Sequence, residues 1–164
     1  MKKPDENTTT LIDHYLMMVG KLVNNAAVCD SILFETFRII SGCNEGIASA
    51  IYFSAESIHA KRNIIRRILT VLDDKIESEI IEKIIAATEK SHAQRNELGH
   101  AALIATNDGT LRRHNPRNQG QAQKPVTGPY LDALLKHSSE AQILALTQIH
   151  ALRQRRGIPQ PIVS

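Results

Sequence analysis

The chain has 164 residues, of which 42% are hydrophobic and 23% charged, with a formal net charge of +3. This length suits one domain with a substantial core, and the absence of an apolar run near about 18 residues speaks against a membrane protein. The N-terminal sequence MKKPDENTTT is polar and charged, so no export signal is expected. We therefore expect a cytoplasmic protein without a membrane partner, in which Cys29 and Cys43 are reduced thiols.

Positive charge is concentrated towards the C-terminus. Residues 1–109 carry 12 Lys and Arg against 15 Asp and Glu, whereas residues 110–164 carry 8 against 2. A basic segment of this kind suits an anionic partner, with nucleic acid first. The alternative is a solvated basic segment that binds nothing.

The first predicted element is a long helix over residues 8–41, which Gly42 ends. Apolar residues recur there at spacings of three and four: Leu11, Tyr15, Val19, Leu22, Ala26, Cys29, Leu33, Phe37 and Ile40. The segment is either one very long helix or two helices with a kink near Gly20 or Asn24-Asn25.

Three further helices are predicted before the basic segment begins. A short helix covers residues 45–53, and another runs over about residues 55–72. The fourth begins at Asp74, because Glu77 three residues later completes a capping box, and it runs to about Thr106.

A basic loop separates the fourth helix from the last one. Residues 110–128 contain two prolines and no acid, and they lack apolar periodicity. Pro129 suits the first residue of a final helix, which ends before Gly157.

Together these elements predict an all-α fold, since no strand-like alternation extends beyond a few residues. We expect a single helical domain over residues 1–164, a bundle of four to six helices with long antiparallel members. Residues 1–7 form a flexible N-terminus and residues 157–164 a C-terminal tail in this scheme.

The segment RNELGH, residues 95–100, stands out within the fourth helix. On a helical wheel Arg95 and Gly99 fall in line with the buried stripe of this helix, while Asn96 and His100 lie on its flank. An unpaired buried guanidinium is costly, so the stripe must open there onto a partner chain, a carboxylate or a cleft. Arg95 and His100 are about 140° apart and about 7.5 Å apart along the axis. One regular helix therefore does not easily bring both to the same atom, whereas a kink or a second copy of the chain would.

This Arg-polar-three residues-His pattern, late in a long helix of an all-α bundle, resembles the higher eukaryotes and prokaryotes nucleotide-binding (HEPN) superfamily. The resemblance covers most of residues 8–155 in architecture and six residues in motif. It implies metal-independent RNA cleavage, without a cofactor, by a homodimer whose two motifs line one cleft. In that scheme His100 is the general acid and base, Arg95 holds the scissile phosphate, and Asn96 orients the phosphate or the histidine.

One position departs from the superfamily pattern. Some toxins of this superfamily carry a tyrosine two residues after the histidine, the target of a partner nucleotidyltransferase. This chain has Ala102 there, which speaks against that mode of neutralisation. An antitoxin or another regulatory protein is still a candidate partner.

Basic residues outside the motif are candidates for contacts to the RNA backbone. They are Arg62, Arg66, Arg112, Arg113, Arg117 and Lys124. The alternative for such residues is a merely solvated face. Metal binding finds no support, because the seven histidines are scattered and no H-E-x-x-H or Cys/His pair occurs.

Other interpretations remain open. Arg95 is alternatively a helix residue paired with Glu35 or Asp30. His92, one turn before Arg95, is interpreted as a bystander, with an extra imidazole for the cleft as the alternative. The rival to a ribonuclease is a non-catalytic dimer of the same fold that binds a nucleotide, RNA or a protein. A third hypothesis is a helical adaptor or regulator that uses its basic C-terminal part on DNA.

Overall fold

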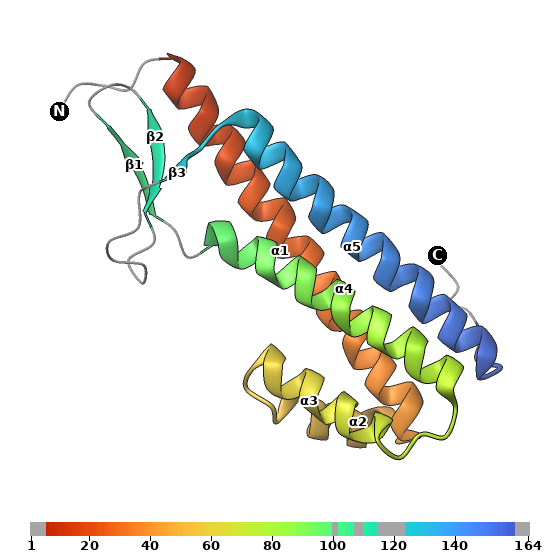
Figure 1. Cartoon of the computed structure of the whole chain (residues 1–164). Coiled ribbons are helices and arrows are strands. Elements are labelled where there is room, and N and C mark those ends of the chain that lie inside the picture. The colour runs from red at the N-terminus through yellow and green to blue at the C-terminus, as the bar shows by residue number, and fades with distance from the viewer. Residues whose placement is uncertain (1–5, 100–101, 107–109, 115–123, 160–164) are drawn as a thin grey trace.

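The computed structural model describes residues 6–99, 102–106, 110–114 and 124–159. Their regular elements are, in chain order, α1 (Glu6–Ser41), α2 (Glu45–Phe53), α3 (Ile58–Leu69), α4 (Lys75–Gly99), β1 (Ala102–Ala105), β2 (Leu111–His114), β3 (Lys124–Pro125) and α5 (Gly128–Arg155). Over these residues the fold is a helical bundle with one small sheet, so the predicted all-α class is confirmed (Figure 1).

Three long helices, α1, α4 and α5, lie side by side, with α2 and α3 at one end and the sheet at the other (Figure 1). The α4 helix runs antiparallel to α1 and to α5, so α1 and α5 are parallel. The reason is topological. The segment with α2 and α3 reverses the chain between α1 and α4, and the sheet reverses it again before α5. The predicted antiparallel packing therefore holds for two of the three pairs of long helices.

The α1 helix is continuous from Glu6 to Ser41, so the segment forms one long helix rather than two. Asn25 is buried, and its side-chain amide donates hydrogen bonds to the hydroxyls of Ser138 and Ser139 on α5, at 3.3 and 3.4 Å. Asn25 therefore serves packing rather than a break in the helix. Gly42 follows the helix with a φ of 64°, the left-handed conformation that ends many helices.

The segment Thr8–Ser41 is long and apolar enough to cross a membrane by length and composition alone. The core helix of a bundle passes the same test, and α1 packs against both α4 and α5. Its residues Leu22, Cys29 and Leu33 are fully buried in these contacts.

Two hydrophobic clusters hold the bundle together. The larger joins the second half of α1 to α2, α3 and the adjoining parts of α4 and α5, with Leu33, Tyr52 and Ile65 fully buried. The smaller joins the first half of α1 to Leu98 and Leu131 near the sheet. Burial of each such side chain stabilises the fold by about 1.5–3 kcal/mol. The two cysteines, Cys29 and Cys43, are free thiols.

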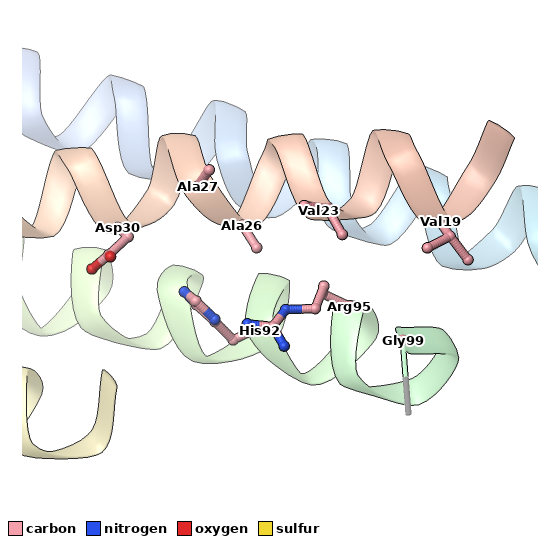
Figure 2. A pocket seen from close by; sticks show the side chains of 8 residues that line it. All are labelled: Val19, Val23, Ala26, Ala27, Asp30, His92, Arg95 and Gly99. Atoms are coloured by element: carbon pink, nitrogen blue, oxygen red, sulfur yellow. The ribbon is translucent and has the colours of Figure 1, made fainter. Parts of the chain in front are cut away.

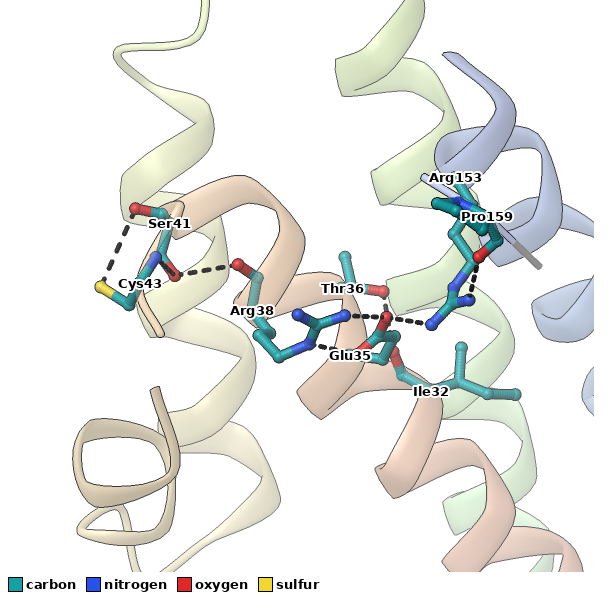
Figure 3. A network of polar contacts seen from close by, with 8 residues as sticks. All are labelled: Ile32, Glu35, Thr36, Arg38, Ser41, Cys43, Arg153 and Pro159. Atoms are coloured by element: carbon teal, nitrogen blue, oxygen red, sulfur yellow. Dashed lines mark hydrogen bonds and ion pairs between the residues drawn. The ribbon is translucent and has the colours of Figure 1, made fainter. Parts of the chain in front are cut away.

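An ion-pair network ties α1 to the end of α5 (Figure 3). The carboxylate of Glu35 accepts two hydrogen bonds of 2.7 Å from Arg38 and one of 2.5 Å from Arg153. Arg153 also donates to the carbonyl oxygen of Pro159 at 2.9 Å. The network therefore fixes the end of the chain's last helix against α1.

The predicted start of α4 is confirmed, because Asp74 Oδ1 accepts a hydrogen bond of 3.0 Å from the backbone N–H of Glu77. The buried carboxylate of Glu77 does not complete a capping box. It accepts instead from Arg156, at 2.8 Å, and Arg155 donates to Asp74 at 3.0 Å. The last turn of α5 is thus tied to the first turn of α4.

The predicted end of α4 was wrong. The helix ends at Gly99 rather than near Thr106, and Ala102–Ala105 forms β1, which pairs antiparallel with β2. Four apolar residues fit a strand as well as a helical turn, so periodicity alone does not separate the two. Leu111 at the start of β2 is buried in the smaller cluster, which holds the hairpin on the bundle.

The predicted basic loop, residues 110–128, contains more order than the sequence suggested. It includes β2 and β3, which pair antiparallel with Arg113 opposite Lys124. Residues 115–123 of this loop lie outside the described residues. The α5 helix begins at Gly128, one residue before the predicted Pro129, and the hydroxyl of Thr127 caps it.

Candidate functional site

A pocket of about 490 Å³ lies between α1 and the second half of α4 (Figure 2). One wall is the apolar and small side chains of α1, and the other is the polar side chains of α4. Its lining residues are Val19, Val23, Ala26, Ala27, Asp30, His92, Arg95 and Gly99. The sequence predicted that the buried face opens at Arg95 onto a partner chain, a carboxylate or a cleft. The structure shows a cleft beside Arg95 within this chain.

The pocket forms where the buried stripe of α4 changes character. In the first half of the helix this stripe consists of apolar side chains such as Ile81, Ile84 and Ile85, which pack in the core. About two to four turns further on, the same face carries His92, Arg95 and Gly99. On α1, the small side chain of Ala26 points towards α4 between Asp30 and Val23 (Figure 2), and Ala27 also belongs to the lining.

Arg95 makes no hydrogen bond or ion pair with any residue that the structure describes. Both acids proposed as its partners are engaged elsewhere. Glu35 binds two arginines at the far end of α1, and Asp30 accepts from Lys61 at 3.2 Å and from the hydroxyl of Tyr52 at 2.8 Å. The guanidinium therefore faces the pocket with its donors available to an anion.

His92 lies between Asp30 and Arg95 in the pocket (Figure 2) and is only 9% exposed. Its Nε2 is buried and has no hydrogen-bond partner among the described residues. Burial lowers the pKa of His92, and the neighbouring charge of Arg95 lowers it further. The imidazole is therefore neutral near pH 7. Its place on the core face one turn before Arg95 was the signal that it belongs to the pocket.

Asp30 lies at one end of the pocket, and hydrogen bonds from α2 and α3 fix its carboxylate. Tyr52 donates to one carboxylate oxygen and Lys61 to the other. Burial, with the adjacent carboxylate of Asp30, strongly raises the pKa of Tyr52, so its hydroxyl stays a donor. The ammonium of Lys61 also lies 4.9 Å from the ring centres of Tyr52 and Phe53.

The structure brings together only part of the predicted motif. Arg95 and Gly99 line the pocket, whereas Asn96 is exposed on α4 and is not part of the lining. His100 lies outside the described residues, directly after the last residue of α4. The site as described is therefore Arg95 with His92, and the motif histidine adjoins it in sequence.

Contacts at the end of α4 hold the motif in place. The buried hydroxyl of Tyr15 donates a hydrogen bond of 2.9 Å to the carbonyl oxygen of Leu98. Glu97 forms an ion pair of 2.5 Å with Arg113 on β2 and accepts a hydrogen bond of 3.0 Å from Tyr130 on α5. The last turn of α4 is thus fixed from α1, the sheet and α5 at once.

The predicted RNA-contacting basic residues divide by their partners. Arg62 is largely buried and lies 3.6 Å from Glu89, which also accepts from Arg66 at 3.2 Å. Arg113 pairs with Glu97, and its guanidinium lies 5.9 Å from the ring centre of Tyr130.

Arg112 precedes Arg113 on β2, and its buried Nε has no hydrogen-bond partner among the described residues. Arg117 lies outside the described residues, and only the backbone of Lys124, in β3, is described. That these residues contact RNA stays a prediction. Within the described ranges no three His, Cys, Asp or Glu side chains are grouped so as to hold a metal ion.

Comparison with known proteins adds no family to this description: no family model, curated protein or solved structure matches the chain.

Proposed function

We propose that this protein is a HEPN-like, metal-independent endoribonuclease that acts as a homodimer. The observation that carries the proposal is the guanidinium of Arg95, which faces an open pocket without an acidic partner among the described residues. A half-buried cation without an acidic partner among the described residues is costly to retain, so a function that needs it is the simplest reason for its presence. The RNA phosphate is the proposed anion.

The proposed reaction needs only groups that the motif supplies. An imidazole accepts the proton of an RNA 2′-hydroxyl, whose oxygen forms a bond to the adjacent phosphorus while the bond from phosphorus to the 5′-oxygen breaks. The leaving 5′-oxygen takes a proton, and the products are a 2′,3′-cyclic phosphate and a 5′-hydroxyl. His100 is the proposed acid and base, Arg95 stabilises the charge on the phosphate, and Asn96 orients one of the two.

A face of α1 beside the pocket supports the proposed homodimer. Leu16 is 61% exposed and Val23 is 48% exposed, and they share one side of the helix with Gly20 and Ala27. Exposed apolar residues in a continuous stripe mark interaction surfaces. The stripe reaches the pocket, since Val23 and Ala27 also line it, so a second copy seated here would bring two pockets together.

The remaining assignments follow from the same proposal. RNA is the proposed partner, contacted along its backbone by Arg66, Arg112, Arg117 and Lys124, with Arg62 and Arg113 held closer to the protein by carboxylates. We further propose a cytoplasmic location, and an antitoxin or regulatory protein as a second partner.

The decisive experiment compares RNA cleavage, with EDTA present, by the wild type and by His100→Ala and Arg95→Ala. We expect cleavage by the wild type only, with cyclic phosphate at the new 3′ ends. Equal activity of the wild type and His100→Ala, or no cleavage at high enzyme concentration, would refute the ribonuclease hypothesis.

Mixing the two inactive variants tests the composite site. If Arg95 of one chain acts with His100 of the other, a mixed dimer contains one intact site, and the mixture should cleave RNA when neither variant alone does. A mixture that forms mixed dimers yet stays inactive would show that each chain carries its own complete site.

The second candidate function is a non-catalytic dimer that binds a nucleotide, RNA or a protein. One observation favours it: the pocket joins an apolar wall to Arg95 and His92 and so resembles a ligand site even without His100. Tight RNA binding without cleavage, lost in Arg95→Ala but unchanged in His100→Ala, would select this function.

A further inference from the structure

His92 is the polar group in the pocket that the proposed reaction does not use. The side chain is only 9% exposed, and it lies beside Arg95 with a buried Nε2 that lacks a hydrogen-bond partner among the described residues. A buried nitrogen without a partner is costly, so such atoms in native proteins generally have a ligand or water to bind. Because the side chain of His92 also lines the pocket, a ligand that enters the pocket is the candidate partner for this nitrogen.

Helix geometry lets His92 and Arg95 contact the same ligand more easily than it lets Arg95 and His100 do so. Residues three apart lie on one face, about 4.5 Å apart along the axis, whereas residues five apart lie on different sides. One chain can therefore hold a single anionic group between the imidazole of His92 and the guanidinium of Arg95. The motif histidine has no such relation to the arginine within a regular helix.

The charges around His92 favour an anion. Three cations influence its imidazole: Arg95 from its own helix, and Arg62 and Lys61 from α3. The one anion among these influences is Asp30 of α1, whose carboxylate is already bound by Lys61 and Tyr52. Arg62 is in turn shared with Glu89. The guanidinium of Arg95 is thus the one charge of this group without a counterion among the described residues.

We infer that His92 and Arg95 of one chain together bind one RNA phosphate, and that His92 takes up a proton from solvent as the phosphate arrives. This inference rests on the proposed function and names the group that holds its substrate. In the free protein His92 is neutral because burial and neighbouring cations lower its pKa. A phosphate beside it offsets those cations and favours the imidazolium, which then donates from Nε2 to a phosphate oxygen.

Linkage gives the expected pH dependence. Because the complex holds one proton more than the free protein, affinity for RNA falls as pH rises, by at most about tenfold per pH unit, between the free and bound pKa of His92. Above the bound pKa the neutral imidazole still donates one hydrogen bond, and the affinity becomes constant.

The test uses an octanucleotide of 2′-O-methyl RNA, which binds but lacks the hydroxyl needed for cleavage. Histidine NMR signals are followed against pH with and without this RNA, and the signal of His92 is assigned by its absence in His92→Gln. We expect the pKa of His92 to rise on binding. An unchanged pKa would overturn the inference.

Affinity measurements on variants complete the test. His92→Gln keeps a donor near the position of Nε2 but does not titrate, so we expect it to retain binding near pH 8 and to lose the increase at lower pH. His92→Leu should bind at least about tenfold more weakly at pH 6 than the wild type, with its folding checked by thermal melting. His137→Gln, an exposed position on α5, is the matched control and should behave as the wild type.

Identical pH dependence in the wild type and His92→Gln would refute the inference even if RNA is cleaved. The two proposals therefore fail separately. Loss of the ribonuclease hypothesis would appear as equal cleavage by the wild type and His100→Ala, whereas this inference is read only from binding of an RNA that is not cleaved.

Discussion

The hydroxyl of Tyr15 donates a hydrogen bond of 2.9 Å to the carbonyl oxygen of Leu98, across 83 positions of the chain. Leu98 is the penultimate residue of α4, where carbonyl groups have no partner within the helix. The bond therefore both satisfies one of these carbonyls and fixes the turn that carries Arg95 and Gly99 against α1. The site's geometry depends on a contact that lies outside the motif.

Replacing Tyr15 by Phe should loosen this turn. We expect the free energy of unfolding to fall by about 1–2 kcal/mol, since a buried carbonyl loses its partner while the ring stays packed. Hydrogen exchange should accelerate most in the last turn of α4 and little around Ile84, in the middle of the same helix. Equal acceleration at both places would contradict the proposed local role.

Arg95→Met should separate stability from activity. The arginine has no counterion among the described residues, so an apolar side chain of similar length should leave the free energy of unfolding unchanged or raise it slightly. RNA cleavage should fall about 100-fold or more, because a group that stabilises the transition-state charge is lost. A large loss of stability, measured by urea unfolding, would instead assign Arg95 a structural role.

The Glu35 network predicts an acid-sensitive link between α1 and α5 (Figure 3). Burial raises the pKa of Glu35, but hydrogen bonds from Arg38 and Arg153 outweigh it, so the pKa lies below its ordinary value of 4.5. Stability from a carboxylate with a depressed pKa is fully present above about pH 4.5 and is lost as pH falls through the folded pKa.

Glu35→Gln should therefore lower the free energy of unfolding by about 2 kcal/mol at pH 7, and this difference should shrink as pH falls below 4.5. Urea unfolding at a series of pH values measures it. Glu140→Gln is the control, because Glu140 is exposed and lies 3.9 Å from Lys90. A pH-independent effect of Glu35→Gln would show that the charge of the carboxylate is not what matters.

The two arginines of β2 should differ in what they support. Arg113 binds Glu97 and lies over Tyr130, so Arg113→Ala should lower the free energy of unfolding by about 1.5–3 kcal/mol. Arg112 has no such ion pair among the described residues, so Arg112→Ala should change stability by less than about 1 kcal/mol but weaken RNA binding and its salt dependence. Thermal unfolding and RNA titration at two salt concentrations distinguish them. If Arg112→Ala lowered stability and Arg113→Ala weakened RNA binding instead, the two assignments would be wrong.

Val23→Arg should break the proposed dimer without unfolding the chain. Val23 is 48% exposed, so the monomer tolerates a charge there, whereas two facing copies would bury it. We expect sedimentation to show a dimer for the wild type and a monomer for the variant, with RNA cleavage lost. Val71→Arg is the control, since Val71 is 81% exposed at the other end of the bundle, beyond α3. A wild type that is monomeric at high concentration would refute the composite site.

The helices were predictable because each depends on local signals. The apolar repeat of α1, the cap at Asp74 and the turn residues before α5 are all read from a few neighbouring positions. The hairpin was not predictable in this way, because β1 is a strand only through its pairing with β2 and through the burial of Leu111. Pairing partners are set by tertiary packing, which a short apolar run does not specify.

For the site, the sequence by itself determined that Arg95 and Gly99 continue the buried face of α4, since this follows from helical spacing alone. Only the tertiary structure decided that the face meets a pocket there. The small side chain of Ala26 on α1 points towards α4, and the acids that would have paired with Arg95 are bound by other partners. The same folding placed His92 beside Arg95 with an unpartnered nitrogen, because which groups lack partners depends on every helix that packs around them.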